Sequence, residues 1–246
     1  MPEGPSIVIL KELVQALALE GHRVIAVSGN TKIDKERMLH QPLIAFKSWG
    51  KHFLICFEEF TLRIHFMMFG SYRINDRKES AVRLGLSFEN AELNFYTCSL
   101  KYIEGDINAS YDWHADVMAE QWDPKKALKK IKTKPAELIC DILLDQQIFS
   151  GVGNIIKNEV LYRVGIHPLS VVEKIPVAKL KLLITAARQY SFDFLKWKKA
   201  YVLKKHWLVN TRKICAAGHP LEKAYLGKTK RRTFFCPICQ KRYPPI

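Results

Sequence analysis

The sequence predicts an α+β protein of two domains, the second of which ends in a small Cys/His unit. Residues 1–121 contain runs rich in β-branched and aromatic residues, which are typical of strands. Residues 124–205 instead place apolar side chains at helical spacing, and residues 206–246 group cysteines and a histidine at short intervals. Trp122-Asp123-Pro124 is the predicted linker. A chain of 246 residues, 48% of them hydrophobic, can bury an ample core.

The first domain is predicted to begin with a helix and to continue as strands. Ile7, Leu10 and Val14 belong to an apolar series at helical spacing, which predicts a helix from Ser6 to about Leu19. Ser6 follows Gly4-Pro5 and is the expected N-cap. Strand-like runs, broken at Trp49-Gly50 and at Glu58-Glu59, follow at residues 43–57, 62–74 and 93–96.

The second domain is predicted to be helical. Its first helix is rich in lysine, its second is amphipathic, and its third stops at Gly165 with Pro168 beyond. These helices and a fourth are expected at residues 125–132, 135–149, 154–164 and 177–197.

The charge of the chain is concentrated toward its C-terminus. Lys and Arg number 39 and Asp and Glu 24, a net charge of +15. Residues 1–123 have a net charge of −4 and residues 124–195 of +6, whereas residues 196–246 hold 14 basic side chains and one acidic. A run of like charge is often only a solvated surface. So large an imbalance favours an anionic partner, nucleic acid first and an anionic membrane surface second.

Membrane-spanning and secreted proteins are not expected. No apolar run reaches the roughly 18 residues of a membrane span, and no signal sequence precedes the first motif. The chain has six cysteines. Those outside the terminal unit lie singly in apolar runs and are expected to be buried thiols in a reducing cytoplasm: Cys56, Cys98 and Cys140.

The terminal unit has the spacing of a structural zinc site. Two close pairs of ligands, 16 residues apart, can fold a hairpin around one tetrahedral ion. The alternative is chance clustering of thiols in a core, but the segment is too short and too charged to have a core of its own. The predicted ligands of the single zinc ion are Cys215, His219, Cys236 and Cys239.

Two further segments are candidate phosphate sites. Phe149 to Ile156 is a glycine-containing turn between two helices, where backbone N–H groups at the helix start can hold a phosphate and Asn154 can act as the cap. An ordinary helix–helix turn is the alternative. Lys228 to Arg232 is predicted at the tip of the hairpin, where arginine can contact phosphate.

The N-terminus carries a candidate nucleophile. Removal of Met1 before the small Pro2 would leave a secondary amine, and an α-amino group has a pKa of about 7.7–8.0. A neutral amine can attack C1′ of a sugar and form a Schiff base. The neighbouring Glu3 could move protons during base loss and ring opening.

In these motifs the chain resembles the Fpg/Nei family of DNA glycosylases (formamidopyrimidine-DNA glycosylase and endonuclease VIII). Four features agree in order over essentially the whole chain: Pro2-Glu3-Gly4-Pro5, Gly50-Lys51, Gly151-Val-Gly-Asn154 continuing to Gly165-Ile-His-Pro168, and the terminal Cys/His unit. The resemblance implies an N-terminal β-sandwich with a leading helix and a C-terminal helix-two-turn-helix domain with a zinc finger. It also implies a monomer that binds damaged duplex DNA in the cleft between the domains.

The resemblance also implies roles for single residues. Pro2 is the implied nucleophile, Glu3 the acid/base, and Lys51 a catalytic and phosphate-binding lysine, unless Lys51 is simply a solvated hairpin residue. Arg231, five residues before Cys236, is implied to support catalysis by holding a phosphate. The turn and the finger are implied to contact DNA through Gly153, Asn154, Arg231 and Arg232.

A base turned out of the duplex leaves a gap that apolar side chains fill. His65-Phe-Met-Met-Phe-Gly70 occupies the segment that supplies these side chains in the family. Met67, Met68 and Phe69 are the implied wedges, and a buried strand is the alternative. His65 is either a phosphate ligand or a core histidine.

The implied activity is that of a bifunctional glycosylase and abasic-site lyase for oxidised bases. The endonuclease VIII-like branch, with oxidised pyrimidines as substrates, is favoured by Gly4 and by the absence of an Arg-Arg-Phe-Gly loop in residues 95–102. Gly165-Ile-His-Pro168 favours the formamidopyrimidine and 8-oxoguanine branch. A non-catalytic protein that binds damaged DNA is the third possibility. The expected location is the bacterial cytoplasm, at the nucleoid. Ser6, where the family usually has Glu, and the Cys-x3-His pair are departures from the pattern.

Overall fold

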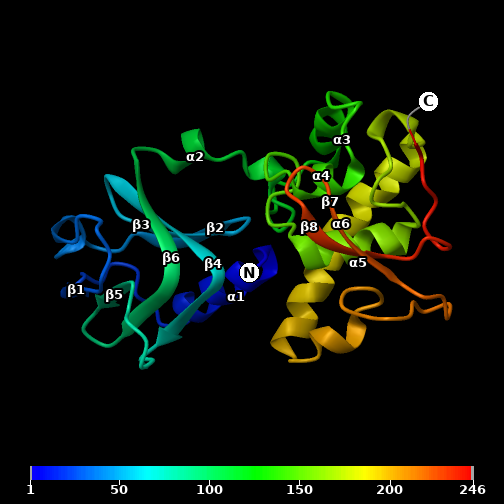
Figure 1. Ribbon diagram of the computed structural model, residues 1–246. Coiled ribbons are helices and arrows are strands. Elements are labelled where there is room, and N and C mark those ends of the chain that lie inside the picture. The colour runs from blue at the N-terminus through cyan, green and yellow to red at the C-terminus, as the bar shows by residue number, and fades with distance from the viewer. Residues whose placement is uncertain (1, 245–246) are drawn as a thin grey trace. The chain divides into compact units, whose positions relative to one another are not determined.

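The computed structural model describes residues 2–244, which fall into two compact units divided after Tyr111. Figure 1 shows the long strands and the first helix in one unit, and most of the helices with a short terminal hairpin in the other. Each unit has its own hydrophobic core. Among the described residues, no helix combines the length and the apolar character that crossing a membrane requires.

The first unit is built on a six-stranded sheet with the order β1-β5-β6-β4-β3-β2, in which every pairing is antiparallel. Two strands are much longer than the others, β4 (Phe60–Ile74) and β6 (Glu92–Glu104). The shorter strands are β1 (Ala26–Ser28), β2 (Ala45–Trp49), β3 (His52–Cys56) and β5 (Leu84–Ser87).

The sheet has two halves, one formed around β1 and β5 and the other around β2 and β3, and the long strands β4 and β6 run through both. β5 pairs with residues 92–95 of β6, whereas β3 pairs with residues 61–65 of β4. Buried side chains from both halves, such as Leu86 and Ile64, belong to one core cluster. The half-sheets therefore face a common interior, which is the arrangement expected of a sandwich.

The leading helix α1 (Gly4–Gln15) covers this core with Ile7, Leu10 and Val14. It begins two residues before the predicted start, and its N-cap is Glu3, not Ser6. Proline is favoured in the first turn of a helix because its fixed φ suits the helix and its nitrogen needs no partner there. Pro5 therefore allows the earlier start.

The second unit contains the helices that the sequence predicts, with one large difference. The predicted helix 135–149 is wrong in extent, because only α4 (Ile139–Leu144) is helical there. Leu138 is extended and bridges to Val171, and Asp145 is again extended after the last turn. The other long helices are α3 (Pro124–Lys132), α5 (Asn154–Val164) and α6 (Val177–Lys199).

Short elements connect these parts. A single-turn helix, α2 (Ile107–Ser110), closes the first unit. The 3₁₀ turns are η1 (Glu36–Met38), η2 (Trp113–Ala115), η3 (Val172–Lys174) and η4 (Leu203–His206). The terminal hairpin consists of β7 (Glu222–Leu226) and β8 (Arg231–Phe235).

The division after Tyr111 differs from the linker predicted at residues 122–124. Trp122 is buried in the core of the second unit, with its ring 5.8 Å from that of Phe149. Asp123 caps α3 by accepting hydrogen bonds from the backbone N–H groups of Lys125 and Lys126. A tryptophan that packs and an aspartate that caps are structural residues of the helical unit.

Candidate active site, metal centre and nucleic-acid interface

The proposed catalytic pair, Pro2 and Glu3, lies at the start of α1. Pro2 is half-buried, whereas Glu3 is only 4% exposed and has an extended backbone immediately before the helix. The positive end of the helix dipole favours a carboxylate at this position. The structure therefore places a buried acid beside the residue that would carry the amine. The removal of Met1 concerns a residue outside the described part of the chain.

Lys51 lies in the tight turn between β2 and β3. Gly50 precedes it with φ +52°, a left-handed conformation that glycine adopts without strain. On the strands beside the turn, His52 faces His65 with ring centroids 5.2 Å apart. The Nδ1 atom of His52 is 3.0 Å from the Tyr111 hydroxyl, so the turn rests on a cluster of aromatic and imidazole rings.

Burial favours the neutral form of both histidines in this cluster. Burial lowers the pKa of His52 to about 3, and the charges of Arg63 and Lys51 act in the same direction. Burial also lowers the pKa of His65, against a hydrogen bond to the Lys51 backbone that raises it. The other side of the His65 ring, Nδ1, is buried without a hydrogen-bond partner among the described residues. The ring of His65 thus packs against His52 and is hydrogen-bonded to the Lys51 backbone.

Met67, Met68 and Phe69 are exposed, although they lie in the middle of β4. Their exposed fractions are 50%, 61% and 81%. The register of β4 on β6 shifts between Phe66 and Ser71, so these residues leave the regular ladder. A Cβ on Gly70 would lie 2.7 Å from Phe66 Cβ and from the Thr97 carbonyl, so the bulge requires glycine there. The alternative of a buried strand is wrong for all three.

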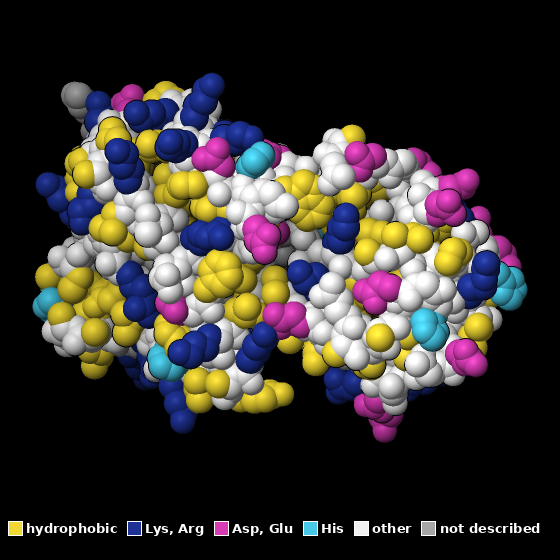
Figure 2. Space-filling view, turned by 180° about the vertical axis from the view of Figure 1, so that it is seen from behind, with side chains coloured by type: hydrophobic (Ala, Val, Ile, Leu, Met, Phe, Trp, Pro, Cys, Tyr) yellow, Lys and Arg dark blue, Asp and Glu magenta, His cyan; other side chains and the backbone are white. Residues whose placement is uncertain are grey.

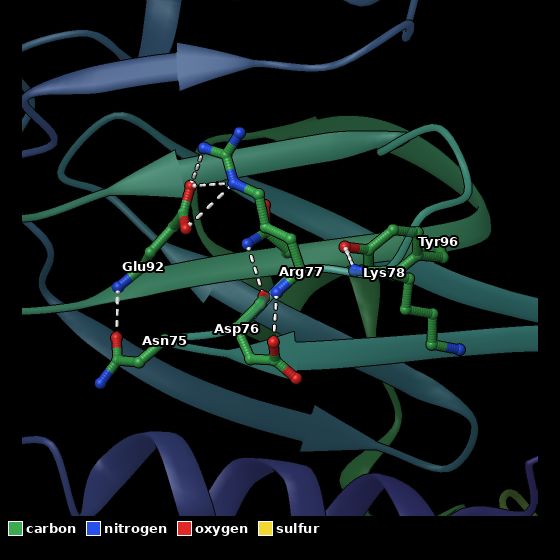
Figure 3. A network of polar contacts seen from close by, with 7 residues as sticks. Asn75, Asp76, Arg77, Lys78, Glu92 and Tyr96 are labelled. Carbon is green, nitrogen blue, oxygen red and sulfur yellow. Dashed lines mark hydrogen bonds and ion pairs between the residues drawn. The ribbon is translucent and has the colours of Figure 1, made fainter.

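A polar network fixes β4 beyond the exposed apolar segment (Figure 3). Arg77 forms an ion pair with Glu92, whose backbone N–H donates to Asn75 Oδ1 at 2.7 Å. Lys78 adds two bonds, from its backbone to the Tyr96 hydroxyl at 3.0 Å and from Nζ to Ser71 Oγ at 2.6 Å. Sequence reasoning missed this network, because its members come from β4, from the β4–β5 turn and from β6.

Asn154 is not the cap that the sequence predicts. The N-cap of α5 is Gly153, and Asn154 is the first helical residue. Its side-chain Nδ2 donates to the backbone carbonyl of Arg232, 2.6 Å away on β8. A glycine-containing turn thus starts the helix, and the asparagine side chain links the turn to the terminal hairpin.

The buried face of α5 also contacts this hairpin. Lys157 is 1% exposed, and its Nζ donates to Thr233 Oγ1 at 2.7 Å. Next along the helix, the fully buried Glu159 accepts hydrogen bonds from the backbone N–H groups of residues 208, 209 and 210. Sequence reasoning missed these roles. The available signal was the polar run Lys157-Asn-Glu159 between apolar residues on both sides, in a helix whose two ends were predicted.

The four predicted metal ligands converge. The ligand atoms of Cys215, His219, Cys236 and Cys239 all lie within 4.8 Å of one another. His219 Nδ1 lies 3.2 Å from Cys239 Sγ and 3.8 Å from the Sγ atoms of Cys215 and Cys236. A tetrahedral zinc ion with bonds of about 2.0–2.3 Å separates its ligand atoms by roughly 3.3–3.8 Å. This donor set and spacing fit a tetrahedral metal ion.

The remaining cysteines are buried thiols, as predicted. Burial raises the pKa of Cys98 to about 12 and that of Cys140 to about 11, and it also raises the pKa of Cys56. Protonated, buried thiols are poor metal ligands and poor nucleophiles.

The Gly165-Ile-His-Pro168 motif holds the end of the metal-binding segment. Gly165 ends α5 in the left-handed conformation, and its carbonyl accepts the N–H of Lys241 at 2.9 Å. The N–H of His167 donates to the Lys241 carbonyl, and Gln240 Nε2 donates to the carbonyl of Ile166. The motif therefore binds residues 240–241 through its backbone and fixes the end of the metal-binding segment.

The tip of the hairpin differs from the prediction. Residues 227–230 form the turn, whereas Arg231 and Arg232 lie on β8. The backbone N–H of Lys228 donates to both carboxylate oxygens of Asp141, and its ammonium forms an ion pair with Glu137. The tip is thus docked on the helical unit. In residues 2–244, Arg231 and Arg232 form no ion pair, which leaves their guanidinium groups available to an anion.

Comparisons with known proteins agree with this geometry. The profile of the formamidopyrimidine-DNA glycosylase N-terminal domain matches residues 1–98, and that of the formamidopyrimidine-DNA glycosylase H2TH domain matches residues 115–192. Endonuclease 8-like 3 of Xenopus laevis is 30% identical over 246 residues, covering 94% of this chain and 40% of that protein. Endonuclease 8-like 2 of Bos taurus is 33% identical over 197 residues, covering 74% of this chain and 58% of that protein. The chain thus spans about two fifths to three fifths of the length of these relatives.

Solved structures show the same fold. A viral DNA glycosylase superposes with a TM-score of 0.84 at 22% identity, over 97% of this chain and all of that chain. The Lactococcus lactis formamidopyrimidine-DNA glycosylase, bound non-covalently to DNA containing an abasic site, gives a TM-score of 0.85 at 20% identity over 98% of this chain and all of that one. With both domain profiles, the fold and the endonuclease 8-like relatives in agreement, the chain belongs to the Fpg/Nei family, on its endonuclease VIII-like side.

Proposed function

We propose that this protein is a bifunctional DNA glycosylase and abasic-site lyase that removes oxidised pyrimidines from duplex DNA. The observation that carries the proposal is the buried Glu3 carboxylate, held at the start of α1 beside Pro2. A buried acid next to a secondary amine is suited to moving protons around a Schiff base. The names of the relatives and the family of the two domain profiles support the same reaction.

In the proposed reaction, the neutral Pro2 nitrogen attacks C1′ of the damaged nucleotide. The N–C1′ bond forms as the bond from C1′ to the base breaks, and the base leaves with a proton. Glu3 serves the opening of the sugar ring by proton transfer. Loss of a C2′ proton from the Schiff base expels the 3′ phosphate, and a second elimination expels the 5′ phosphate. Water then releases the sugar remnant from Pro2.

Other residues would hold the DNA. Asn154 uses one N–H of its amide on the Arg232 carbonyl, which leaves the second for a phosphate. Arg231 is the proposed second phosphate ligand, with Arg232 beside it on β8. Lys51, in the tight turn between β2 and β3, is the proposed catalytic and phosphate-binding lysine. The exposed Met67, Met68 and Phe69 fit the role of wedges that replace a flipped base.

The metal centre would support DNA binding by the terminal hairpin. We propose that Cys215, His219, Cys236 and Cys239 hold one zinc ion, which supplies structural stability and no chemical step. The ion would hold together the two ends of the β7–β8 hairpin, and β8 carries Arg231. Binding of metal and folding of this segment would then be one process.

Borohydride reduction in the presence of DNA with an abasic site tests the reaction. A Schiff base becomes a permanent amine on reduction, so the protein with a free Pro2 should form a covalent DNA adduct. Pro2→Gly should reduce both trapping and strand cleavage. A matched preparation that retains Met1 has an amide at Pro2 and should form no adduct. Tight DNA binding without any adduct from the processed protein would contradict the enzyme and favour a non-catalytic damage-binding protein.

A panel of duplexes, each with one lesion, tests the substrate class. Faster nicking at an oxidised pyrimidine than at 8-oxoguanine is expected. The reverse order would favour the second candidate, a glycosylase for formamidopyrimidines and 8-oxoguanine, to which Gly165-Ile-His-Pro168 points.

A further inference from the structure

Lys157 is a buried ammonium at the contact between α5 and the terminal hairpin. Its side chain is 1% exposed, as is that of Thr233, and the two are joined by the 2.7 Å bond from Nζ to Oγ1. Burial of an ammonium is unfavourable unless hydrogen bonds compensate for the lost water. An apolar side chain of similar length would fill the same space at a lower desolvation cost, so packing alone does not explain a lysine here.

The bond continues to the backbone of the proposed phosphate ligand. Thr233 Oγ1 accepts from Lys157 and donates its own proton to the carbonyl of Arg231 at 3.0 Å. A hydroxyl has one proton to donate and two lone pairs, so both bonds can exist at once. Bonds to an ionised group are stronger than neutral ones, and the ammonium polarises the hydroxyl toward the carbonyl.

A second bond from the same helix fixes the next residue. Asn154 Nδ2 donates to the carbonyl of Arg232 at 2.6 Å. Asn154 and Lys157 are three positions apart and therefore lie on one face of α5. Of two consecutive carbonyls at the start of β8, that of Arg232 is thus bound by α5 directly, and that of Arg231 is bound by Thr233, which Lys157 of α5 holds in turn.

We propose that Lys157 is a positioning residue for DNA binding. Through Thr233 it fixes the backbone at Arg231, so that the guanidinium of Arg231 meets a DNA phosphate without further ordering of the strand. This inference rests on the proposed function, which gives Arg231 its phosphate. A side chain that is ordered before binding loses less conformational entropy on association, and the affinity is higher for that reason.

The test is a double-mutant cycle between Thr233 and Arg231. Thr233→Val keeps the shape of the side chain and removes the hydroxyl, whereas Thr233→Ser keeps the hydroxyl. Affinity for a duplex with a non-cleavable abasic-site analogue is measured by fluorescence anisotropy at several salt concentrations. Thr233→Val should weaken binding by about tenfold and Thr233→Ser by less than about twofold. In the Arg231→Ala background, Thr233→Val should cause no further loss.

Lys157→Met is the second variant, because methionine keeps a long flexible stem without the charge. It should reproduce the loss of Thr233→Val and also lose that effect in the Arg231→Ala background. Metal content and thermal unfolding of every variant show whether the hairpin is intact. A variant with intact metal and reduced affinity separates positioning from loss of fold.

The outcomes are distinct. An equal loss on Thr233→Val with and without Arg231 would mean that Thr233 acts independently of the arginine, and the inference would be wrong. Full affinity of Thr233→Val beside a weakened Arg231→Ala would overturn the inference and leave the proposed role of Arg231 intact. Full affinity of Arg231→Ala, with an unchanged salt slope, would overturn that role and this inference together.

Discussion

The two units of this protein differ in charge more than in size. The residues up to Tyr111 hold 13 basic and 13 acidic side chains, a net charge of zero, whereas residues 112–246 hold 26 and 11 and carry the whole net charge of +15. Figure 2 shows lysine and arginine crowded on one unit and mixed with acidic side chains on the other. We therefore expect the first unit to supply the proposed chemistry and the second unit to supply most of the electrostatic attraction to DNA phosphates.

Most of the eleven carboxylates of the helical unit form contacts within it. Glu159 binds three backbone N–H groups, Asp141 and Glu137 hold the hairpin tip, and Asp112 pairs with Lys130 at 2.7 Å. By contrast, residues 196–213 contain seven basic side chains and no acidic one. Because the acids are engaged in holding the fold, the excess positive charge remains at the surface. An anionic polymer is the partner that such a surface fits.

Glu3→Gln should separate the roles of the two units most clearly, because it should reduce cleavage and leave DNA affinity nearly unchanged. General acid–base catalysis contributes about 100-fold to 10,000-fold, so cleavage of a damaged duplex should fall by at least about 100-fold. DNA affinity should change by less than about twofold, because the grip lies in the other unit. Single-turnover cleavage and anisotropy binding measure the two effects. Glu20→Gln, at an exposed position near the same helix, is the matched control. Normal turnover of Glu3→Gln would remove Glu3 from the catalytic assignment.

Removal of the metal should have the opposite effect: it should lower DNA affinity and leave the first unit intact. Extraction of zinc with a strong chelator should lower DNA affinity by more than about tenfold, because metal binding supplies the folding free energy of the terminal segment. The first unit contains none of the four ligands and should unfold at an unchanged temperature. Binding before chelation, after it and after zinc is restored gives the comparison. Metal-free protein that binds DNA at full affinity would show that the centre does not support the interface.

Charge reversal should affect the units unequally. Lys204→Glu with Lys205→Glu should weaken DNA binding severalfold and reduce the salt slope by about one to two, since each phosphate contact contributes about 0.9. Lys32→Glu with Lys101→Glu makes the same change of charge at exposed positions of the first unit and should alter the slope much less. Equal effects of the two pairs would mean that only total charge matters.

The smallest expected effect is the pH dependence of the stability of the first unit, which arises from His52. The pKa of His52 is about 3 in the folded protein and about 6.5 when unfolded, so only the unfolded state binds the proton between these values. The contribution to stability is complete above pH 6.5 and decreases as the pH falls toward 3, by at most about 1.4 kcal/mol per pH unit for one proton.

Calorimetry at pH 7, 6 and 5 measures this dependence. The unfolding temperature of the first unit should fall by a few degrees with the pH, and less steeply in His52→Gln, which cannot take up the proton. The lowered pKa of His65 leaves a residual slope in that variant. Identical slopes for both proteins would mean that His52 is not the group that titrates.

Helix α5 was predicted with its observed bounds, and the reason is local. Its start follows a glycine-containing turn and its end is a left-handed glycine, so the nearby sequence determines both ends. The predicted helix 135–149 failed because apolar spacing alone does not reveal that Leu138 pairs with Val171, far along the chain. The strands β1 and β5, of three and four residues, are too short for a pattern to appear.

The candidate site shows the same limit. The metal ligands were predictable because their spacing is local, and they do converge. The exposure of Met67, Met68 and Phe69 followed only from the family resemblance, because alternation along a strand does not reveal a bulge that arises from the pairing with β6. The local sequence predicts Asn154 as a helix cap and cannot reveal its observed partner, the Arg232 carbonyl, which is 78 residues away.

By itself, the sequence predicted the α+β class, the four residues that converge as candidate metal ligands, and the accumulation of positive charge toward the C-terminus. Each of these depends on residue type and on short spacing along the chain. Only the tertiary structure decided where the units divide, that the hairpin tip docks on Asp141 and Glu137, and that Lys157 reaches Thr233. These contacts join residues far apart in the chain. For Lys157 the physical reason is burial, since a buried polar group must find a partner and only the folded protein determines which one.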